Sequence, residues 1–391
     1  MNNTHTDNEE LARARAALAA AGCDVALLSS ITNVTYVSGF EVPIALGVSA
    51  AVPYAAPFAV ISAKDTPTWL ATSVFHTTQA KRESRLDQLL TFAGFDSFQS
   101  SDARGTYLEA VRSALQQAGL GQIGRLGVEG RALPYGAAAL IAREFPQVQL
   151  IEIDETMDGA RQIKTAREID RLRRAAHVGD IGHHTLAELA QTAGRSEFDM
   201  YAEIVSRMQQ AAGHEIPVSG ELVTGPRTTT VNYPDGPRDR ITKPGDAALM
   251  DISQRIDGYW SDCTNTHVIG GVPPTETQKK FARASQAAFE AAAENLRPGK
   301  LASEVWAAAN AAYEKHGIPM PHYMGHQIGA TVNELPRLVP YDHTRIEANM
   351  VFAVEPGAYQ GPGGSFGARS EKMVWVSEAG PEILSQFTWG I

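Results

Sequence analysis

Cysteine is nearly absent from this chain of 391 residues. Its two cysteines, Cys23 and Cys263, lie far apart in the sequence, which excludes a disulfide framework and a thiolate metal cage. No apolar run approaches the roughly 20 residues that a membrane-spanning helix needs. The first residues also lack the basic start and apolar core of a secretory signal peptide. These absences predict a cytoplasmic protein with no membrane partner.

Basic residues are also in short supply. The chain has 34 Lys and Arg against 44 Asp and Glu, a formal net charge of −10, and no polybasic stretch. A nucleic acid or an anionic membrane surface is therefore excluded as the main partner. The content of hydrophobic residues, 43%, is that of an ordinary folded protein. At roughly 150 residues per domain, the length predicts two domains.

The first domain is expected over residues 1–153, where short β-rich runs alternate with helical patterns. The β-rich runs are at 24–30, 58–64, 67–72, 125–130 and 148–153. The helical patterns are at 9–22 and 107–121. This mixture predicts an α/β domain of ordinary size.

The remaining residues, 154–391, show the same order of elements twice. Two helical patterns and a β-rich segment are followed by two helical patterns and a β-rich segment: 161–191, 197–212 and 218–271, then 275–295, 303–316 and 328–376. Such an internal duplication predicts a pseudo-symmetric α+β domain with a site between its halves.

Acidic residues interrupt the segment 250–271, which otherwise suits a buried hairpin. Asp257 and the following glycine are a strong signal for a two-residue hairpin turn. With that turn, Ser253 pairs with Asp262, and Asp251 shares their face of the sheet. Two ionised carboxylates side by side on a half-buried sheet are unfavourable unless a cation compensates them. Surface exposure, an arginine partner or a shared metal ion would each explain them.

Three later segments place a polar residue where an apolar β-run should be buried. His326 lies among prolines and glycines that disfavour a helix, Glu355 ends an apolar run, and Glu371 precedes one. With Asp251 and Asp262 they supply four carboxylates and one imidazole. Two divalent cations would balance the four negative charges, and this donor set suits Mn, Co or Fe(II) as well as Zn.

Four ordered segments are similar to the signature segments of the creatinase, Xaa-Pro aminopeptidase and methionine aminopeptidase superfamily, in its prolidase-like M24 branch. They are KPGDAALMDISQRIDGYWSDCTNT, GHQIG, VFAVEPGAY and GARSEK. The resemblance spans nearly the whole chain. It implies a pita-bread catalytic domain over residues 154–391, a smaller α/β creatinase-type domain over residues 1–153, and a homodimer.

The resemblance also implies a site that holds two divalent metal ions (Mn, Co, Fe or Zn). All five of the family's ligand positions are filled, by Asp251, Asp262, His326, Glu355 and Glu371. Creatinase itself lacks this set, so the likeness is to the metal-dependent branch.

Several residues near the ligands match catalytic positions of the family. Glu355 would shuttle a proton, and His322 would contact the substrate and, with a metal ion, stabilise the negative oxygen of the reaction. Tyr359 and Arg369 match the tyrosine after the Glu-Pro-Gly turn and the arginine beside the last ligand. Two family histidines that help to hold the scissile carbonyl are replaced, by Pro234 and Asn333. Asn333 still donates a hydrogen bond but cannot carry a proton near neutral pH.

The implied activity is that of a metal-dependent hydrolase. It would cleave the amide of a small Xaa-Pro dipeptide, or of a similar compact N-substituted amino acid, by attack of a metal-bound hydroxide. The two missing histidines leave a second hypothesis open, a non-peptidase hydrolase or lyase of a small osmolyte on the same site. A third hypothesis, a binding protein on an inactive peptidase fold, would not require all five ligands.

Overall fold

The computed structural model describes residues 8–44, 54, 56–64, 66–121, 123–231 and 235–391. The chain divides into two compact units, Met1–Arg161 and Gln162–Ile391. Helix α7 (Asp154–Gln162) lies almost wholly in the first unit, whereas the sequence pattern predicted a division between residues 153 and 154. Among the described residues, no helix is both long enough and apolar enough to cross a membrane.

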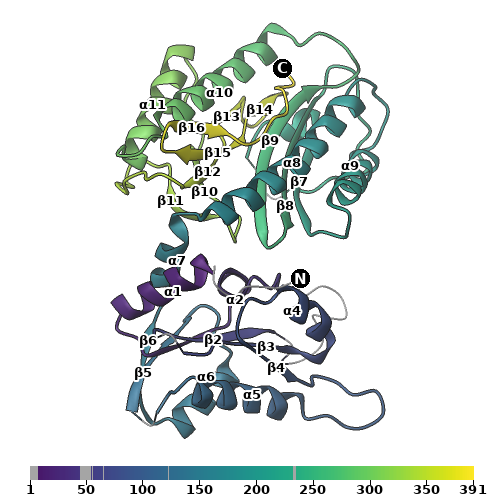
Figure 1. The fold of residues 1–391 in the computed structure, drawn as a ribbon. Helices are drawn as coiled ribbons and strands as arrows, with labels where there is room; N and C mark the ends of the chain where they lie inside the picture. Colours follow the sequence, from purple (N-terminus) through teal and green to yellow (C-terminus); the bar gives the residue numbers. More distant parts are fainter. Residues whose placement is uncertain (1–7, 45–53, 55, 65, 122, 232–234) are drawn as a thin grey trace. The chain divides into compact units, whose positions relative to one another are not determined.

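The first unit is built on a six-stranded sheet with the strand order β4-β3-β2-β1-β5-β6 (Figure 1). Its strands are β1 (Val25–Leu28), β2 (Phe58–Ser62), β3 (Trp69–Ser73), β4 (Gln88–Phe92), β5 (Ile123–Val128) and β6 (Gln147–Glu152). Its other helices are α1 (Glu9–Ala20), α2 (Ile31–Ser38), η1 (Val74–His76), α4 (Thr77–Glu83), α5 (Ala103–Gln117) and α6 (Tyr135–Glu144).

Alternation of side chains along the strands gives this sheet two apolar faces. On β1, Val25 and Leu27 belong to the core that also contains residues of α5 and α6. Ala26 and Leu28 belong to the core that contains residues of α1, α2 and α7. The predicted α/β class of this unit is therefore confirmed. The sequence pattern missed β4, α2, α4 and α6.

The second unit contains the duplicated set of elements. The first half comprises α8 (Ala166–Leu189), α9 (Glu197–Ala212), β7 (Val218–Thr224), η2 (Gly225–Thr228), β8 (Ala247–Ile256) and β9 (Tyr259–Val268). The second half begins with α10 (Glu276–Asn295), α11 (Ala302–His316), β10 (Gly325–Gln327), β11 (Glu334–Arg337) and β12 (Val351–Val354). It continues with β13 (Gly357–Tyr359), β14 (Gly367–Arg369), β15 (Lys372–Ser377) and β16 (Gly380–Ile383).

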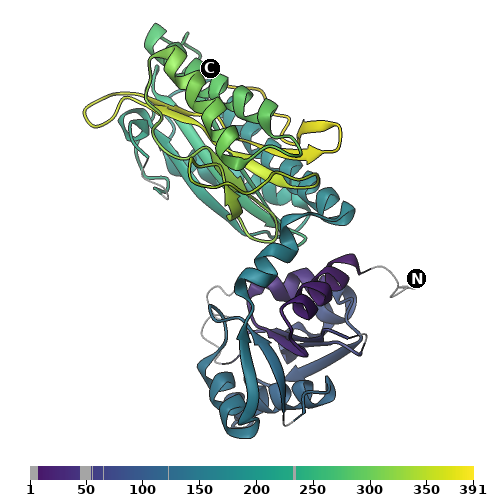
Figure 2. The ribbon, with the colours of Figure 1, turned by 90° about the vertical axis from the view of Figure 1, so that its left-hand side faces the viewer.

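Each helix pair covers the sheet of its own half. Helices α8 and α9 share an apolar core with the sheet β7-β8-β9. Helices α10 and α11 share another with the sheet β11-β10-β12-β15-β16, and Figure 2 shows these green helices beside the yellow strands. The predicted helix, helix, sheet repeat is therefore confirmed.

Two predicted boundaries were wrong. The helix expected from residue 161 is interrupted, because Thr165 and Glu168 form a capping box that starts α8 at Ala166. The β-rich segment expected from residue 328 begins earlier, with β10 at Gly325. His326 therefore lies on a strand inside a sheet and not in the preceding loop.

The hairpin that carries the two aspartates forms with the predicted register. Asp257 and Gly258 have φ angles of 52° and 84°, as a type I′ turn requires. Ser253 pairs with Asp262 across β8 and β9, and the Ser253 hydroxyl donates a 2.7 Å hydrogen bond to the Asp262 carboxylate. Asp251 follows two residues from Ser253, so its side chain lies on the same face. Asp257 itself pairs with the Arg174 guanidinium.

Candidate metal centre

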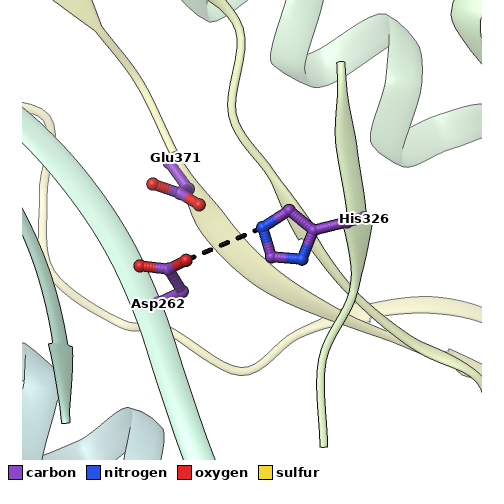
Figure 3. A group of neighbouring side chains, drawn as sticks. All are labelled: Asp262, His326 and Glu371. Atoms are coloured by element: carbon purple, nitrogen blue, oxygen red, sulfur yellow. Dashed lines mark ion pairs between the residues drawn. The ribbon is translucent and has the colours of Figure 1, made fainter. Parts of the chain in front are cut away.

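Three of the predicted ligands meet between the two halves of the second unit. Asp262 comes from β9, His326 from β10, and Glu371 from the residue before β15. One ligand atom of each lies within 4.8 Å of the others (Figure 3), and all three side chains are buried. The His326 Nε2 atom is 3.7 Å from Asp262 Oδ2, the pair that Figure 3 marks with a dashed line. These residues are 45 to 109 positions apart in the sequence, and the fold brings them together.

The other two predicted ligands adjoin this group. Glu355 follows β12, and its Oε1 atom lies 3.4 Å from His326 Nε2. Asp251 interacts electrostatically with Asp262 and Glu371. Its Oδ2 atom accepts a 2.7 Å hydrogen bond from Arg369, but its buried Oδ1 atom has no hydrogen-bond partner among the described residues. A buried carboxylate oxygen without a donor is unfavourable, and a cation would satisfy it.

The orientation of His326 suits metal ligation. Its Nδ1 atom lies 2.9 Å from the backbone carbonyl of Gln327, so Nδ1 carries the proton and donates it there. In the neutral ring this tautomer leaves Nε2 as the acceptor atom, and Nε2 lies next to the carboxylates of Asp262 and Glu355. A second hydrogen bond that fixes the ring in this way is typical of histidine ligands.

Burial raises the pKa values of the clustered carboxyl groups. It raises the pKa of Asp262 to about 7, with a contribution from the charge of Glu355. Burial first, and then the neighbouring carboxylates, raise the pKa of Glu371 well above its ordinary value. The pKa values of Asp251 and Glu355 are raised by the same dominant cause. A group of buried acids that resist ionisation is the arrangement that a multivalent cation would stabilise.

Arg369 is buried at the centre of this network. Its guanidinium donates to Asp251, to the Tyr359 hydroxyl at 3.1 Å and to Thr264 at 3.0 Å. It also donates to Glu221, a buried acid on β7 that the sequence analysis missed. Glu221 pairs directly with Asp251 in the register of β7 and β8. The missed signal was an acid inside the apolar run of β7, the same signal that pointed to Glu355.

His322 and Tyr359 lie next to each other beside the carboxylates. The His322 Nε2 atom is 3.4 Å from the Tyr359 hydroxyl, and its Nδ1 atom is 2.7 Å from the carbonyl of Tyr323. Burial lowers the pKa of His322 to about 4, so the ring is neutral near pH 7. Tyr323 forms a side-chain hydrogen bond with Glu355. His322 and Tyr323 therefore connect the carboxylate cluster to a cavity, whose wall they form in part.

A cavity of about 610 Å³ has His322 and Tyr323 in its wall. Much of the remaining lining is aromatic or apolar, and includes Trp306, Met320 and Tyr341. No lysine or arginine is present among the described residues that line it. A cavity with apolar walls and a few polar groups beside a reactive cluster is typical of a small-molecule site.

The positions of the two replaced histidines differ in what the structure describes. Pro234 lies outside the described residues. Asn333 is exposed, and its side-chain oxygen accepts hydrogen bonds of 3.3 Å and 3.2 Å from Arg337. The structure therefore gives Asn333 a partner that does not belong to the carboxylate cluster, and its role in catalysis stays a prediction.

Comparison with known families agrees with this geometry. A model of metallopeptidase family M24 matches residues 170–378, more than half of the chain. The chain belongs to metallopeptidase family M24. It is a hydrolase of a family that uses divalent metal ions, and a creatinase/prolidase N-terminal domain model matches residues 10–163. The predicted creatinase-type domain and pita-bread catalytic domain are therefore confirmed.

Relatives and solved structures extend the comparison for this M24 member. An Xaa-Pro dipeptidase of Pyrococcus horikoshii is 25% identical over 93% of both chains. The solved Xaa-Pro dipeptidase from Bacillus anthracis has a TM-score of 0.78 at 24% identity, over 97% of this chain and 98% of that one. The N-terminal domain of the FACT complex subunit SPT16 from Cicer arietinum has a TM-score of 0.71 at 13% identity, over 98% and 96%. These structural likenesses show the fold alone.

Proposed function

We propose that this M24 hydrolase is a dipeptidase that uses two divalent metal ions to cleave the amide bond of a small Xaa-Pro dipeptide or a similar compact N-substituted amino acid. The observation that carries the proposal is the convergence of Asp262, His326 and Glu371, with Asp251 and Glu355 beside them. The Xaa-Pro dipeptidase of P. horikoshii, which matches over 93% of this chain, supports the choice of substrate.

The local charge supports two ions and not one. Glu221 and Arg369 form a buried ion pair, so their charges cancel. When they ionise, Asp251, Asp262, Glu355 and Glu371 then leave a charge of −4 in a buried site, which two divalent cations balance. Four carboxylates and one imidazole suit Mn, Co and Fe(II) as well as Zn.

The bound ions would activate a water molecule and polarise the scissile carbonyl. We assign the proton transfers to Glu355, whose Oε1 atom lies 3.4 Å from His326 Nε2 and therefore next to the donor cluster. Its carboxylate would accept a proton from the attacking water and return it to the leaving nitrogen. Burial raises the pKa of Glu355, and a raised pKa suits a carboxyl group that must accept a proton before it releases it.

Tyr359 is the better candidate for the group that stabilises the negative oxygen. The neutral His322 donates its Nδ1 proton to the Tyr323 carbonyl, which leaves Nε2 as an acceptor. The Tyr359 hydroxyl accepts a hydrogen bond from Arg369 and has its own proton to donate. Sequence reasoning placed His322 in this role. The hydrogen-bond pattern instead supports His322 as an acceptor, either of the Tyr359 proton or of a substrate N–H.

The cavity beside His322 supports a small apolar group on the substrate. Its walls of Trp306, Met320 and Tyr341 would bury the ring of a prolyl residue. We further expect a cytoplasmic homodimer. A sedimentation profile that shows a fully active monomer would contradict the expected homodimer.

A second candidate is a non-peptidase enzyme on the same site. The side-chain oxygen of Asn333 accepts hydrogen bonds from Arg337. This position therefore lacks the histidine that would contact the carbonyl of a peptide substrate. A binding protein without catalysis is the third candidate. The complete set of five donors argues against it.

A turnover screen tests the proposal. The full chain would be loaded with Mn, Co or Zn and assayed on Xaa-Pro dipeptides, longer Xaa-Pro peptides and small osmolyte amides. We expect the highest kcat/KM on Xaa-Pro dipeptides, and loss of that turnover in the variant Glu355→Gln, which excludes a contaminating peptidase. Turnover of an osmolyte amide without dipeptide turnover would select the second candidate.

A further inference from the structure

Ser385 contacts Cys263, the residue after Asp262, on the opposite face of strand β9. Consecutive side chains on a strand point to opposite faces, so Cys263 points away from the carboxylate of Asp262. The Cys263 sulfur lies 3.0 Å from the Ser385 hydroxyl oxygen, and both side chains are buried. The same hydroxyl oxygen accepts a 3.1 Å hydrogen bond from the backbone N–H of Met373. Ser385 therefore connects strand β9 to strand β15.

The residue after Glu371 is held by the same part of the chain. The Lys372 ammonium lies 4.6 Å from the centre of the Phe387 ring and 4.5 Å from the centre of a Trp389 ring. It also donates a hydrogen bond to the backbone carbonyl of Phe387. Such cation–π contacts are favourable, and more so where water is excluded. The start of β15, next to Glu371, is thereby fastened to two aromatic rings.

Residues 385–391 are themselves anchored in the second unit. The Asp180 carboxylate on α8 accepts hydrogen bonds from the backbone N–H groups of Gln386, at 2.8 Å, and Phe387, at 3.2 Å. The side chain of Asn265 on β9 bonds to two further backbone groups of the segment. The match to the M24 family model ends at residue 378, so the segment lies outside the matched residues.

We propose that residues 385–391 are a clamp that sets the distance between the carboxylates of Asp262 and Glu371, and that Lys372 is a positioning residue for the metal centre. These two ligands come from different halves of the unit, so the position of β15 relative to β9 sets the distance between their carboxyl groups. The clamp contacts the neighbour of each ligand and thereby fixes that distance. The inference rests on the proposed metal-dependent function.

The test compares Mn²⁺ binding to the metal-free full chain by isothermal titration calorimetry. Lys372→Met keeps an apolar stem and removes the cation, so we expect the Kd for Mn²⁺ to rise about 10- to 100-fold, the usual loss when a partner of a metal ligand is removed. Lys372→Arg keeps a cation over the rings and should hold Kd within about threefold. Arg173→Met is the matched control, because Arg173 lies 5.0 Å over the ring of Trp375 on the same strand. It should leave Kd unchanged.

A second readout separates positioning from general destabilisation. The absorption spectrum of bound Co²⁺ reports the coordination geometry, and we expect it to change in Lys372→Met but not in Arg173→Met. Wild-type Mn²⁺ affinity in Lys372→Met, or an equal loss in the Arg173→Met control, would overturn the clamp. If Lys372→Met does not unfold cooperatively, Ser385→Ala makes the same comparison. A wild-type chain that binds no Mn²⁺ would contradict the proposed function instead.

Discussion

Metal binding should release protons, because the structure keeps acids protonated in the metal-free site. The pKa of Asp262 is raised to about 7, mainly by burial. At about pH 6.5 this carboxyl group is therefore about 0.8 protonated, and it must ionise to ligate a metal ion. Asp251 and Glu371 have pKa values raised well above their ordinary values by the same cause. We expect release of at least about one proton per chain near this pH.

The assay is calorimetric titration of Mn²⁺ into the metal-free chain in buffers with different heats of protonation. The dependence of the apparent enthalpy on that heat gives the number of protons released. The number should fall by about one when the pH is raised to about 8.5, since Asp262 is then ionised beforehand. His267→Gln removes a neutral titratable group elsewhere and should leave the number unchanged. Metal binding without proton release at the lower pH would refute the electrostatic reasoning.

The same shift predicts how metal removal changes stability. A carboxyl group whose pKa is raised in the folded state contributes stability below its unfolded pKa and loses it as the pH rises through the folded value. For Asp262 the window runs from the ordinary 3.8 to about 7 and corresponds to about 4 kcal/mol as an order of magnitude. The stability of the metal-free chain should therefore fall relative to that of the Mn²⁺-loaded chain across this window in chemical denaturation. Parallel curves for the two forms would contradict the assignment.

Three further predictions concern substitutions. Glu355→Gln should lower kcat by at least about 100-fold, because it removes the proton shuttle, while the other four ligands still bind Mn²⁺. Steady-state kinetics measures the loss of kcat, and metal analysis measures the bound Mn²⁺. An unchanged kcat would reject Glu355 as the proton shuttle. Burial lowers the pKa of His267 to about 4. The stability of the wild type relative to His267→Gln should therefore fall as the pH drops from 6.5 towards 4, by about 2 kcal/mol at about pH 5. A stability difference that is the same at every pH would exclude this effect of His267. The double variant Pro234→His with Asn333→His should raise kcat/KM on dipeptides if the chain is a drifted peptidase, and no gain would favour the non-peptidase candidate.

The sequence was most informative where local chemistry sets the structure. The Asp257-Gly258 turn determined the register of β8 and β9, because a two-residue loop of this kind permits only one pairing. That register placed Asp251, Ser253 and Asp262 on one face before any long-range contact was known. His326, Glu355 and Glu371 could be selected as polar residues in apolar runs. The balance of four carboxylates against two divalent cations joined them with Asp251 and Asp262 into one site, and the resemblance then supported that set.

The parts that sequence reasoning missed depend on contacts between distant segments. Glu221 and Arg369 are 148 positions apart, and no local pattern indicates that β7 brings them together. The contacts of Lys372 with Phe387 and Trp389 likewise follow from the path of residues 385–391, which have no helical or strand periodicity. The start of β10 was placed too late, because its first residue is a glycine, which disfavours a strand in propensity but allows the close backbone approach seen here.

Anomalous diffraction from crystals of the Mn²⁺-loaded chain, recorded near the manganese absorption edge, tests the central claim most directly. We predict two strong peaks between the side chains of Asp251, Asp262, His326, Glu355 and Glu371, about 3.5 to 4 Å apart. Peaks elsewhere, or an empty space between these five side chains at saturating Mn²⁺, would contradict the account.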